Sequence, residues 1–157
     1  MKEEEIKEKI YSAFANIAKS LGYSEVYGRI IACLIIHEGP VALSEVAQET
    51  GYSPPMVSLS IDFLETVGMV KRVKRPGDKK LYLQSSGNLL DGLKKVILVK
   101  IQNSVSTSLK EFEEYRKELK ELKKKESKNL LKAIGLLEKE IRKMDEYVKN
   151  LSEMNLP

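Results

Sequence analysis

The chain has 157 residues, of which 32% are charged and 6% aromatic, and its formal net charge is +4. Its single cysteine, Cys33, excludes an internal disulfide and a multi-cysteine metal site, and its longest apolar run, residues 30–36, is too short to cross a bilayer. The N-terminus is charged from the second residue, unlike a signal peptide. We therefore expect a cytoplasmic protein of one small domain, with or without an oligomerisation element, and no membrane partner.

Apolar residues at helical spacing predict two helices at the start of the chain. The first has one apolar face and a Lys/Glu-rich opposite face, and Gly22 ends it. Ser24 is a good N-cap for a second helix, which is apolar nearly all round and stops at Gly39-Pro40. A helix of that kind is usually central in a core.

Residues 43–67 predict a short helix, a turn and another helix. Leu43–Thr50 forms the short helix and Gly51-Tyr52 the turn. Ser53 is the expected N-cap of the next helix, and Pro54 takes its first position, where the missing N–H costs nothing. That helix runs to about Val67.

A change of period after residue 69 predicts a β-hairpin. Its strands are residues 70–75 and 80–84, and Pro76–Lys79 forms the turn. Residues 71–80 contain six basic side chains and one acidic one, a net charge of +5, so the rest of the chain sums to 4 − 5 = −1. A local basic cluster of this kind favours a polyanion as partner.

The last part of the chain is helical again. Apolar residues continue at spacings of three and four from Leu89 to about residue 125, which gives a helix of roughly 55 Å. The final helix, from about residue 130, has a cleaner seam of the coiled-coil type. That seam fits either an antiparallel hairpin within one chain or packing between chains, and the sequence leaves both open.

The order helix, short helix, turn, helix, basic hairpin is the layout of a winged helix-turn-helix. The stretch LSEVAQETGYSPPMVSLSIDFLETVGMVKRV resembles the helix-turn-helix of GbsR-type regulators, a MarR-like family, and VKRVKRPGDKKLYLQ resembles their wing. We therefore predict a mainly α fold with a small β-hairpin. The expected parts are an N-terminal helix of the dimerisation region (1–22), a winged helix-turn-helix DNA-binding domain (23–87) and C-terminal antiparallel or coiled-coil dimerisation helices (88–157).

The resemblance implies a homodimeric transcription regulator, commonly a repressor, on a pseudo-palindromic DNA operator. The recognition-helix positions that it places on DNA are Ser53, Pro54, Pro55, Met56, Ser58 and Leu59. The wing cations that it places on phosphates or the minor groove are Lys71, Arg72, Lys74, Arg75, Lys79 and Lys80. The residues expected at the dimer interface are Ile6, Ile10, Phe14, Leu93, Ile97, Ile101, Val105, Leu109, Leu130, Ile134, Leu137 and Ile141.

The chain departs from the family in the recognition helix. Relatives usually carry Lys-Gly-Asn where Pro54-Pro55-Met56 stands, and basic residues where Asp62-Phe63 stands. Residues 43–68 contain no Lys or Arg, the side chains that make many of the strong contacts to base edges. We therefore expect affinity to come largely from the wing, so that alanine at Arg72, Lys74 and Arg75 flattens the salt dependence of binding. Two alternatives stay open: a winged-helix protein-interaction module, and nonspecific DNA coating. Separately, the basic hairpin could be only a solvated strand edge, where lysines deter strand pairing.

Other chemistry-bearing residues are few. Cys33, in the apolar second helix, is expected to be a small core residue instead of a redox sensor. With one Cys and one His, His37, a catalytic dyad or zinc site has little support, so we expect a non-enzyme with no metal and no cofactor. Four aromatic residues lie near the first two helices, and ordinary core packing is the expectation for them. The alternative is an effector pocket, because some relatives respond to choline-like osmolytes and aromatic rings attract quaternary ammonium. The residues of that candidate effector pocket are Tyr11, Phe14, Tyr23 and Tyr27.

Overall fold

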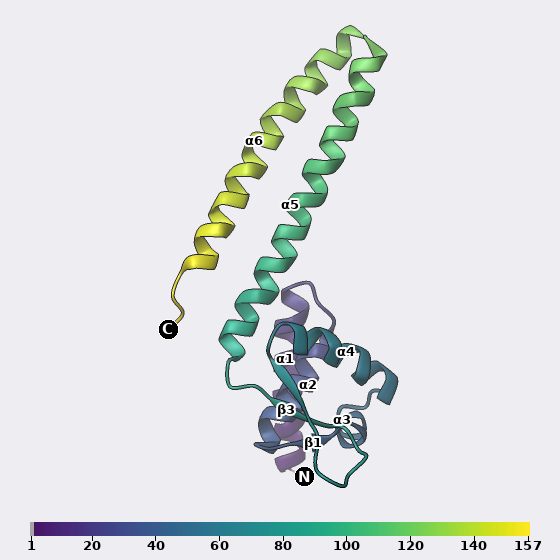
Figure 1. Ribbon diagram of the computed structural model, residues 1–157, viewed down its shortest axis with the longest axis vertical. Helices are drawn as coiled ribbons and strands as arrows, with labels where there is room; N and C mark the ends of the chain where they lie inside the picture. Colours follow the sequence, from purple (N-terminus) through teal and green to yellow (C-terminus); the bar gives the residue numbers. More distant parts are fainter. Residues whose placement is uncertain (1) are drawn as a thin grey trace. The chain divides into compact units, whose positions relative to one another are not determined.

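The computed structural model describes residues 2–157, and its contacts divide the chain into two compact units (Figure 1). The winged unit extends to Leu93 and the helical hairpin unit comprises Lys94–Pro157. The helices are α1 (Lys2–Ser20), α2 (Glu25–His37), α3 (Leu43–Thr50), α4 (Pro54–Thr66), α5 (Leu89–Leu122) and α6 (Lys125–Glu153). The strands are β1 (Val41–Ala42), β2 (Val70–Val73) and β3 (Tyr82–Ser85). The predicted fold class, mainly helical with a small sheet, is confirmed.

The core of the winged unit lies where α2, α3, α4 and the sheet meet. As the sequence predicts, α2 is central: Ile30 and Leu34 are fully buried. Since buried side chains of this size each stabilise a fold by about 1.5–3 kcal/mol, this core fixes α3 and α4 against α2. The other large side chains that are at most 1% exposed in this unit are Val46, Val57, Ile61, Leu64 and Leu83.

The caps of the helix-turn-helix are those that the sequence predicts. The Ser53 hydroxyl accepts a hydrogen bond from the Met56 N–H at 3.3 Å, which starts α4, and Pro54 follows it. Gly51 ends α3 with φ of 79°, a left-handed conformation that costs a glycine little. The direction of α4 relative to α3 is therefore set locally, by three residues of turn chemistry.

The sheet has a third strand that the sequence analysis does not predict. The order is β1-β3-β2, all antiparallel, with Val41 opposite Leu83 and Val70 opposite Ser85. Only two residues of β1 pair, which is too short a run to show an alternating pattern. β1 anchors the base of the β-hairpin to the segment between α2 and α3, so the hairpin is attached on two sides.

Helix α1 packs against α2 at a glycine. A Cβ added at Gly28 would overlap the backbone carbonyl of Phe14, so the two helices approach each other as closely as their backbones permit. Tyr11 and Ala15 are the buried residues of α1, whereas Ile6, Ile10 and Ile17 stay exposed. The first helix therefore belongs to the winged unit and still presents an apolar face to its surroundings.

Alanine at Gly28 is expected to lower the free energy of unfolding by about 1–3 kcal/mol or more, because the added methyl group meets backbone that cannot rotate away. The matched control is Gly135→Ala in α6, where the methyl group meets nothing within 4 Å. That change should be neutral or stabilising by about 0.5–1 kcal/mol. Urea denaturation followed by circular dichroism measures both, and equal effects of the two substitutions would contradict the close approach.

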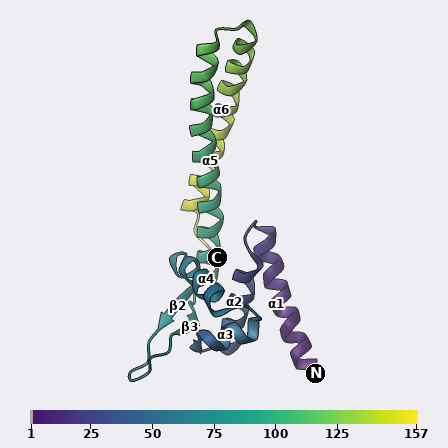
Figure 2. The same cartoon turned by 90° about the vertical axis from the view of Figure 1, so that its right-hand side faces the viewer.

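The helical hairpin unit consists of the main part of α5 and the antiparallel α6, which lie side by side in both views (Figures 1 and 2). Arg116 of α5 donates to Glu138 of α6 at 2.6 Å, and the Lys94 ammonium donates to the Met154 carbonyl at 2.9 Å. The final seam thus folds back within one chain, one of the two arrangements that the sequence leaves open. Among residues 2–157, no helix combines the length and apolar character that a membrane crossing requires.

Candidate nucleic-acid interface

The predicted recognition-helix positions form one exposed surface at the start of α4. All six residues, from Ser53 to Leu59 without Val57, are exposed, whereas Val57 points into the core. Leu59 is 74% exposed and Met56 46%, which is high for large apolar side chains. The surface is apolar and hydroxyl-bearing, so it suits van der Waals contact with thymine methyl groups better than bidentate contact with base edges.

Two serines of α4 have different roles. Ser58 is exposed on the same surface as Leu59. Ser60 is 7% exposed and its hydroxyl donates to the Met56 carbonyl at 2.8 Å. Ser60 is therefore a packing residue, and Ser58 alone of the two is available to a partner.

The wing is a defined structure and not a loose loop. Figure 2 shows the β2–β3 hairpin projecting away from the helices of its unit. Within it, the Tyr82 hydroxyl donates to Asp78 at 2.6 Å, and this bond raises the pKa of Tyr82. The Arg75 guanidinium lies over the Tyr82 ring, 4.2 Å from its centroid. Tyr82 therefore connects the acidic turn residue to one wing cation and holds the loop in shape.

Arg72 departs from its predicted role. Its guanidinium is bonded to Asp62 at 2.5 Å and to Glu65 at 2.9 Å, both on α4. The hydrogen bond with Asp62 is the main cause that raises the pKa of Arg72. Arg72 thus joins the wing to the recognition helix and offsets one of the two negative charges at the end of α4, so its charge is already shared within the chain.

The other wing cations are exposed to solvent. Within the part of the chain that the structure describes, Lys71, Lys74, Lys79 and Lys80 form no ion pair, and Arg75 contacts an aromatic ring. These four lysines and Arg75 carry five positive charges, and Asp78 reduces the sum to 5 − 1 = 4. Arg72 is not counted, because it is paired with α4. An array of this kind attracts phosphates and makes binding depend on salt.

The structure separates the four residues of the predicted effector pocket. Tyr23 and Tyr27 contact each other, and both contact Phe63 of α4, with ring centroids 5.5 and 4.9 Å away. Tyr11 lies in a different cluster: it is 2% exposed and its hydroxyl is bonded to Glu49. Since packing already covers Tyr11, it offers little surface to a ligand, and it lies outside the Tyr23–Tyr27–Phe63 cluster. Phe14, on α1, is half-buried.

The predicted dimer-interface residues also divide into two sets. Val105 and Ile134 are 6% and 8% exposed within a single chain, so they leave little surface for a partner. Ile6, Ile10, Leu130 and Leu137 are exposed. The remaining members are half-buried: Phe14, Leu93, Ile97, Ile101, Leu109 and Ile141.

The chain is similar to solved structures. Neither a protein-family model nor a curated protein sequence matches the chain. A crystal structure described as a transcriptional regulator is similar over 94% of this chain and 99% of its own, with a TM-score of 0.55 and 14% sequence identity. A mutant of Staphylococcus aureus MepR bound to an oligodeoxyribonucleotide has 15% identity and a TM-score of 0.44, with 89% of this chain and 93% of its own covered. NadR in complex with 4-hydroxyphenylacetate has 14% identity and a TM-score of 0.45, and the similarity covers 96% of this chain and 89% of the NadR chain.

The first of these likenesses establishes the architecture. It extends over nearly the whole of both chains, so the long C-terminal helices are part of the shared fold and not an appendage. At 14% identity the similarity shows the fold alone and carries no residue roles.

Proposed function

We propose that this protein is a DNA-binding transcription regulator of the GbsR/MarR-like kind, acting as a homodimeric repressor on a pseudo-palindromic operator. The start of α4 enters the major groove and the wing contacts phosphates or the minor groove. The observation that carries this proposal is the projecting wing with four net unpaired positive charges, attached to the same unit as an exposed recognition helix.

The mode of binding follows from which charges are available. Free lysines on the wing give affinity without sequence information, because phosphates are the same at every base pair. Met56, Ser58 and Leu59 give limited base contact, so much of the specificity must come from DNA shape and deformability. Arg72 offsets one of the two negative charges of Asp62 and Glu65, which reduces a repulsion between α4 and the DNA backbone.

The exposed side of α6 supports the homodimer. Ile134 and Val148, which fall on one heptad position with Ile141, are buried in the single chain. The neighbouring heptad position carries Leu130 and Met144 with Leu137 between them, and all three are half or more exposed. A helix with two apolar columns and only one of them covered needs a second partner, and an identical chain supplies a matching surface.

A protein-interaction module remains the second candidate, and one observation favours it. Leu59 and Met56 are large, apolar and exposed at the tip of α4, a composition that also suits a protein groove. The two functions differ in the role of the wing: an adaptor does not need four unpaired cations, whereas a DNA-binding protein does.

Alanine at both Met56 and Leu59 is expected to weaken binding to the operator roughly tenfold, while binding to random DNA stays unchanged, because the change removes base contacts and no charge. The operator is first obtained by selecting bound genomic fragments and footprinting the enriched site. Fluorescence anisotropy then measures both affinities, with Thr66→Ala at the exposed far end of α4 as control.

The enriched site should contain two half-sites whose centres are about 10–10.5 base pairs, or a multiple of this, apart. Equal affinity of the wild-type protein for random and selected DNA would support nonspecific coating instead. Absence of DNA binding at low salt would favour the interaction module.

A further inference from the structure

The single cysteine and the single histidine of the chain lie side by side and share a carboxylate. Cys33 and His37 are one turn apart on α2, and Glu49 of α3 lies opposite them. The Glu49 carboxylate contacts the His37 Nε2 at 2.8 Å through one oxygen and the Cys33 Sγ at 3.7 Å through the other. All three donor atoms lie within 4.8 Å of one another. The fold therefore brings together three ligand types that the sequence keeps apart.

These distances are close to those of a metal coordination shell. Zn²⁺ bonds of about 2.0–2.3 Å place the donor atoms of a tetrahedron roughly 3.3–3.8 Å apart. The Cys33–Glu49 distance already falls in this range, and the His37–Glu49 distance is shorter only because a hydrogen bond joins the two atoms. The Cys33 Sγ and His37 Nε2 lie within 4.8 Å of each other, so they need to approach by about 1 Å at most to enter this range.

The chemistry of the cluster also suits zinc. Thiolate, imidazole and carboxylate together select Zn²⁺ over Mg²⁺ or Ca²⁺, which prefer oxygen alone. Cys33 is fully buried, whereas His37 and Glu49 are about a quarter and a fifth exposed, so an ion can enter from the side of the His37 ring. Without an ion, burial raises the pKa of the Cys33 thiol to about 11.

We propose that Cys33, His37 and Glu49 form a Zn²⁺ site that joins α2 to α3, with water as the fourth ligand. Binding replaces the Cys33 S–H bond with an S–Zn bond and releases that proton to solvent. The His37 Nε2 gives up the proton that it shares with Glu49 and binds zinc as a neutral imidazole whose one N–H is on Nδ1. Binding also replaces the hydrogen bonds that Glu49 makes with the side chains around it.

Two of the displaced contacts come from α1. Tyr11 donates to Glu49 at 3.0 Å, and the Lys7 ammonium pairs with the same oxygen at 3.0 Å. Burial opposes ionisation of Glu49, but its hydrogen bonds with His37, Lys7 and Tyr11 outweigh that cost and lower its pKa to about 2. Zinc therefore removes a link between α1 and α3 and replaces the hydrogen-bonded link between α2 and α3 with metal bonds, and Lys7 turns to solvent.

Co²⁺ is the direct probe of the site, because zinc itself has no spectrum. Titration of the wild-type protein with Co²⁺ alone should produce a thiolate-to-cobalt charge-transfer band in the near ultraviolet, saturating at one ion per chain. Since Cys33 is the only cysteine, the band reports this residue and no other. Zn²⁺ should abolish the band at stoichiometric concentration. Absence of any charge-transfer band in the folded protein overturns the proposal.

Substitutions identify the other two ligands. His37→Ala and Glu49→Gln should each weaken Zn²⁺ binding more than about tenfold, measured by competition with a chromophoric chelator, since even residues that only support a ligand contribute that much. The matched control is Glu45→Gln, one turn earlier on α3 and exposed, which should bind Zn²⁺ as the wild type does. Equal affinities of all four proteins would mean that the ion binds elsewhere and would also overturn the proposal.

The consequence for regulation rests on the proposed function. If the chain binds DNA, Zn²⁺ should change operator affinity in the wild type and leave it unchanged in Cys33→Ser. The spectroscopic experiment requires no DNA, so failure of the regulator proposal and failure of the metal site give different results.

Discussion

Alanine at Lys74, Lys79 and Lys80 together is expected to weaken DNA binding by roughly 10²–10³-fold in about 0.1 M salt. Each of these side chains is exposed and outside any ion pair in residues 2–157, so each is free to release counterions from a phosphate. With about 0.9 ions released per contact, the slope of log K against log salt should fall by about 2.7. Anisotropy titrations at four or more salt concentrations measure the slope and the affinity in one series.

The choice of residues differs from the one that the sequence suggests. Arg72, which sequence analysis places among the phosphate contacts, is bonded to Asp62 and Glu65, and Arg75 lies on the Tyr82 ring. Substituting either would disturb the wing itself and confuse loss of contact with loss of structure. Three exposed lysines avoid this, since such changes usually alter stability by less than about 0.5 kcal/mol.

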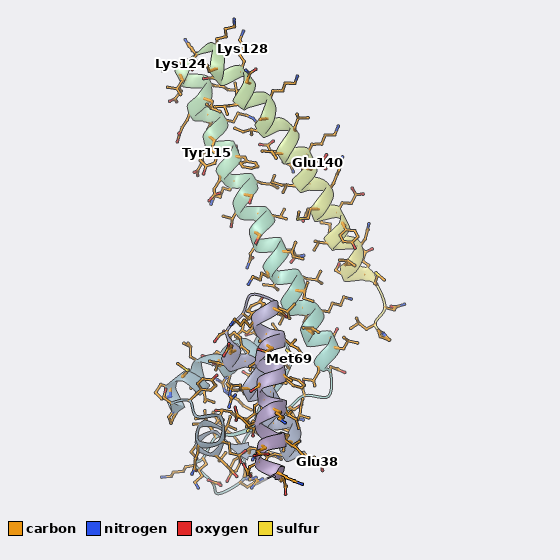
Figure 3. All side chains as sticks on the ribbon, turned by 180° about the vertical axis from the view of Figure 1, so that it is seen from behind. Glu38, Met69, Tyr115, Lys124, Lys128 and Glu140 are labelled. Atoms are coloured by element: carbon orange, nitrogen blue, oxygen red, sulfur yellow. The ribbon has the colours of Figure 1, made fainter. Side chains whose placement is uncertain are left out.

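The control removes the same charge from the other unit. Figure 3 shows Lys124 and Lys128 at the turn between α5 and α6, and Lys125 is exposed between them. Alanine at all three changes the net charge by the same amount and should leave the slope as in the wild type. If both triple variants lose affinity equally, binding depends on overall charge and the wing has no special role.

Much of the fold follows from the sequence because its signals are local. Ser53 and Gly51 fix the helix-turn-helix within a few residues, and both act as predicted. The end of α2 does not follow the expected signal: Glu38, and not Gly39, takes the left-handed conformation, with φ of 58°. Strand β1 is missed because two residues show no period, and its partner Leu83 is about forty residues away.

The site is less predictable because its decisive contacts are between distant residues. The number of basic residues in 71–80 is enough to predict the wing. The ion pair between Arg72 and Asp62 could not be predicted, because the two residues are ten positions apart and meet only in the folded chain. The same limit hides the Cys33–His37–Glu49 cluster. A chain with one cysteine and one histidine has too few of these residues to predict a metal site. Glu49 joins the cluster only because α3 packs on α2. The i, i+4 spacing of Cys33 and His37 on a helix is the signal that could have found it.

Glutamate at both Leu137 and Met144 is expected to convert the dimer into monomers. Both side chains are about half exposed in the single chain, so the proposed dimer buries the remaining half of four side chains, which contributes about 0.7–1.5 kcal/mol each. The sum, roughly 3–6 kcal/mol, corresponds to a rise in the dimer dissociation constant of about two to four orders of magnitude. Sedimentation equilibrium at micromolar concentration detects a change of this size.

Folding of the variant is protected by the structure of α6. Leu137 and Met144 are about half exposed in the single chain, whereas Ile134 and Val148 hold the hairpin together and are left intact. Lys132→Glu with Lys139→Glu adds two glutamates to another, exposed face of the same helix and should remain dimeric. A Leu137/Met144 variant that is still dimeric would place the interface on α1, where Ile6 and Ile10 are also exposed, and charged substitutions there become the deciding test. Because a palindromic operator requires two recognition helices at fixed spacing, the monomeric variant should also lose operator binding while its wing retains affinity for random DNA.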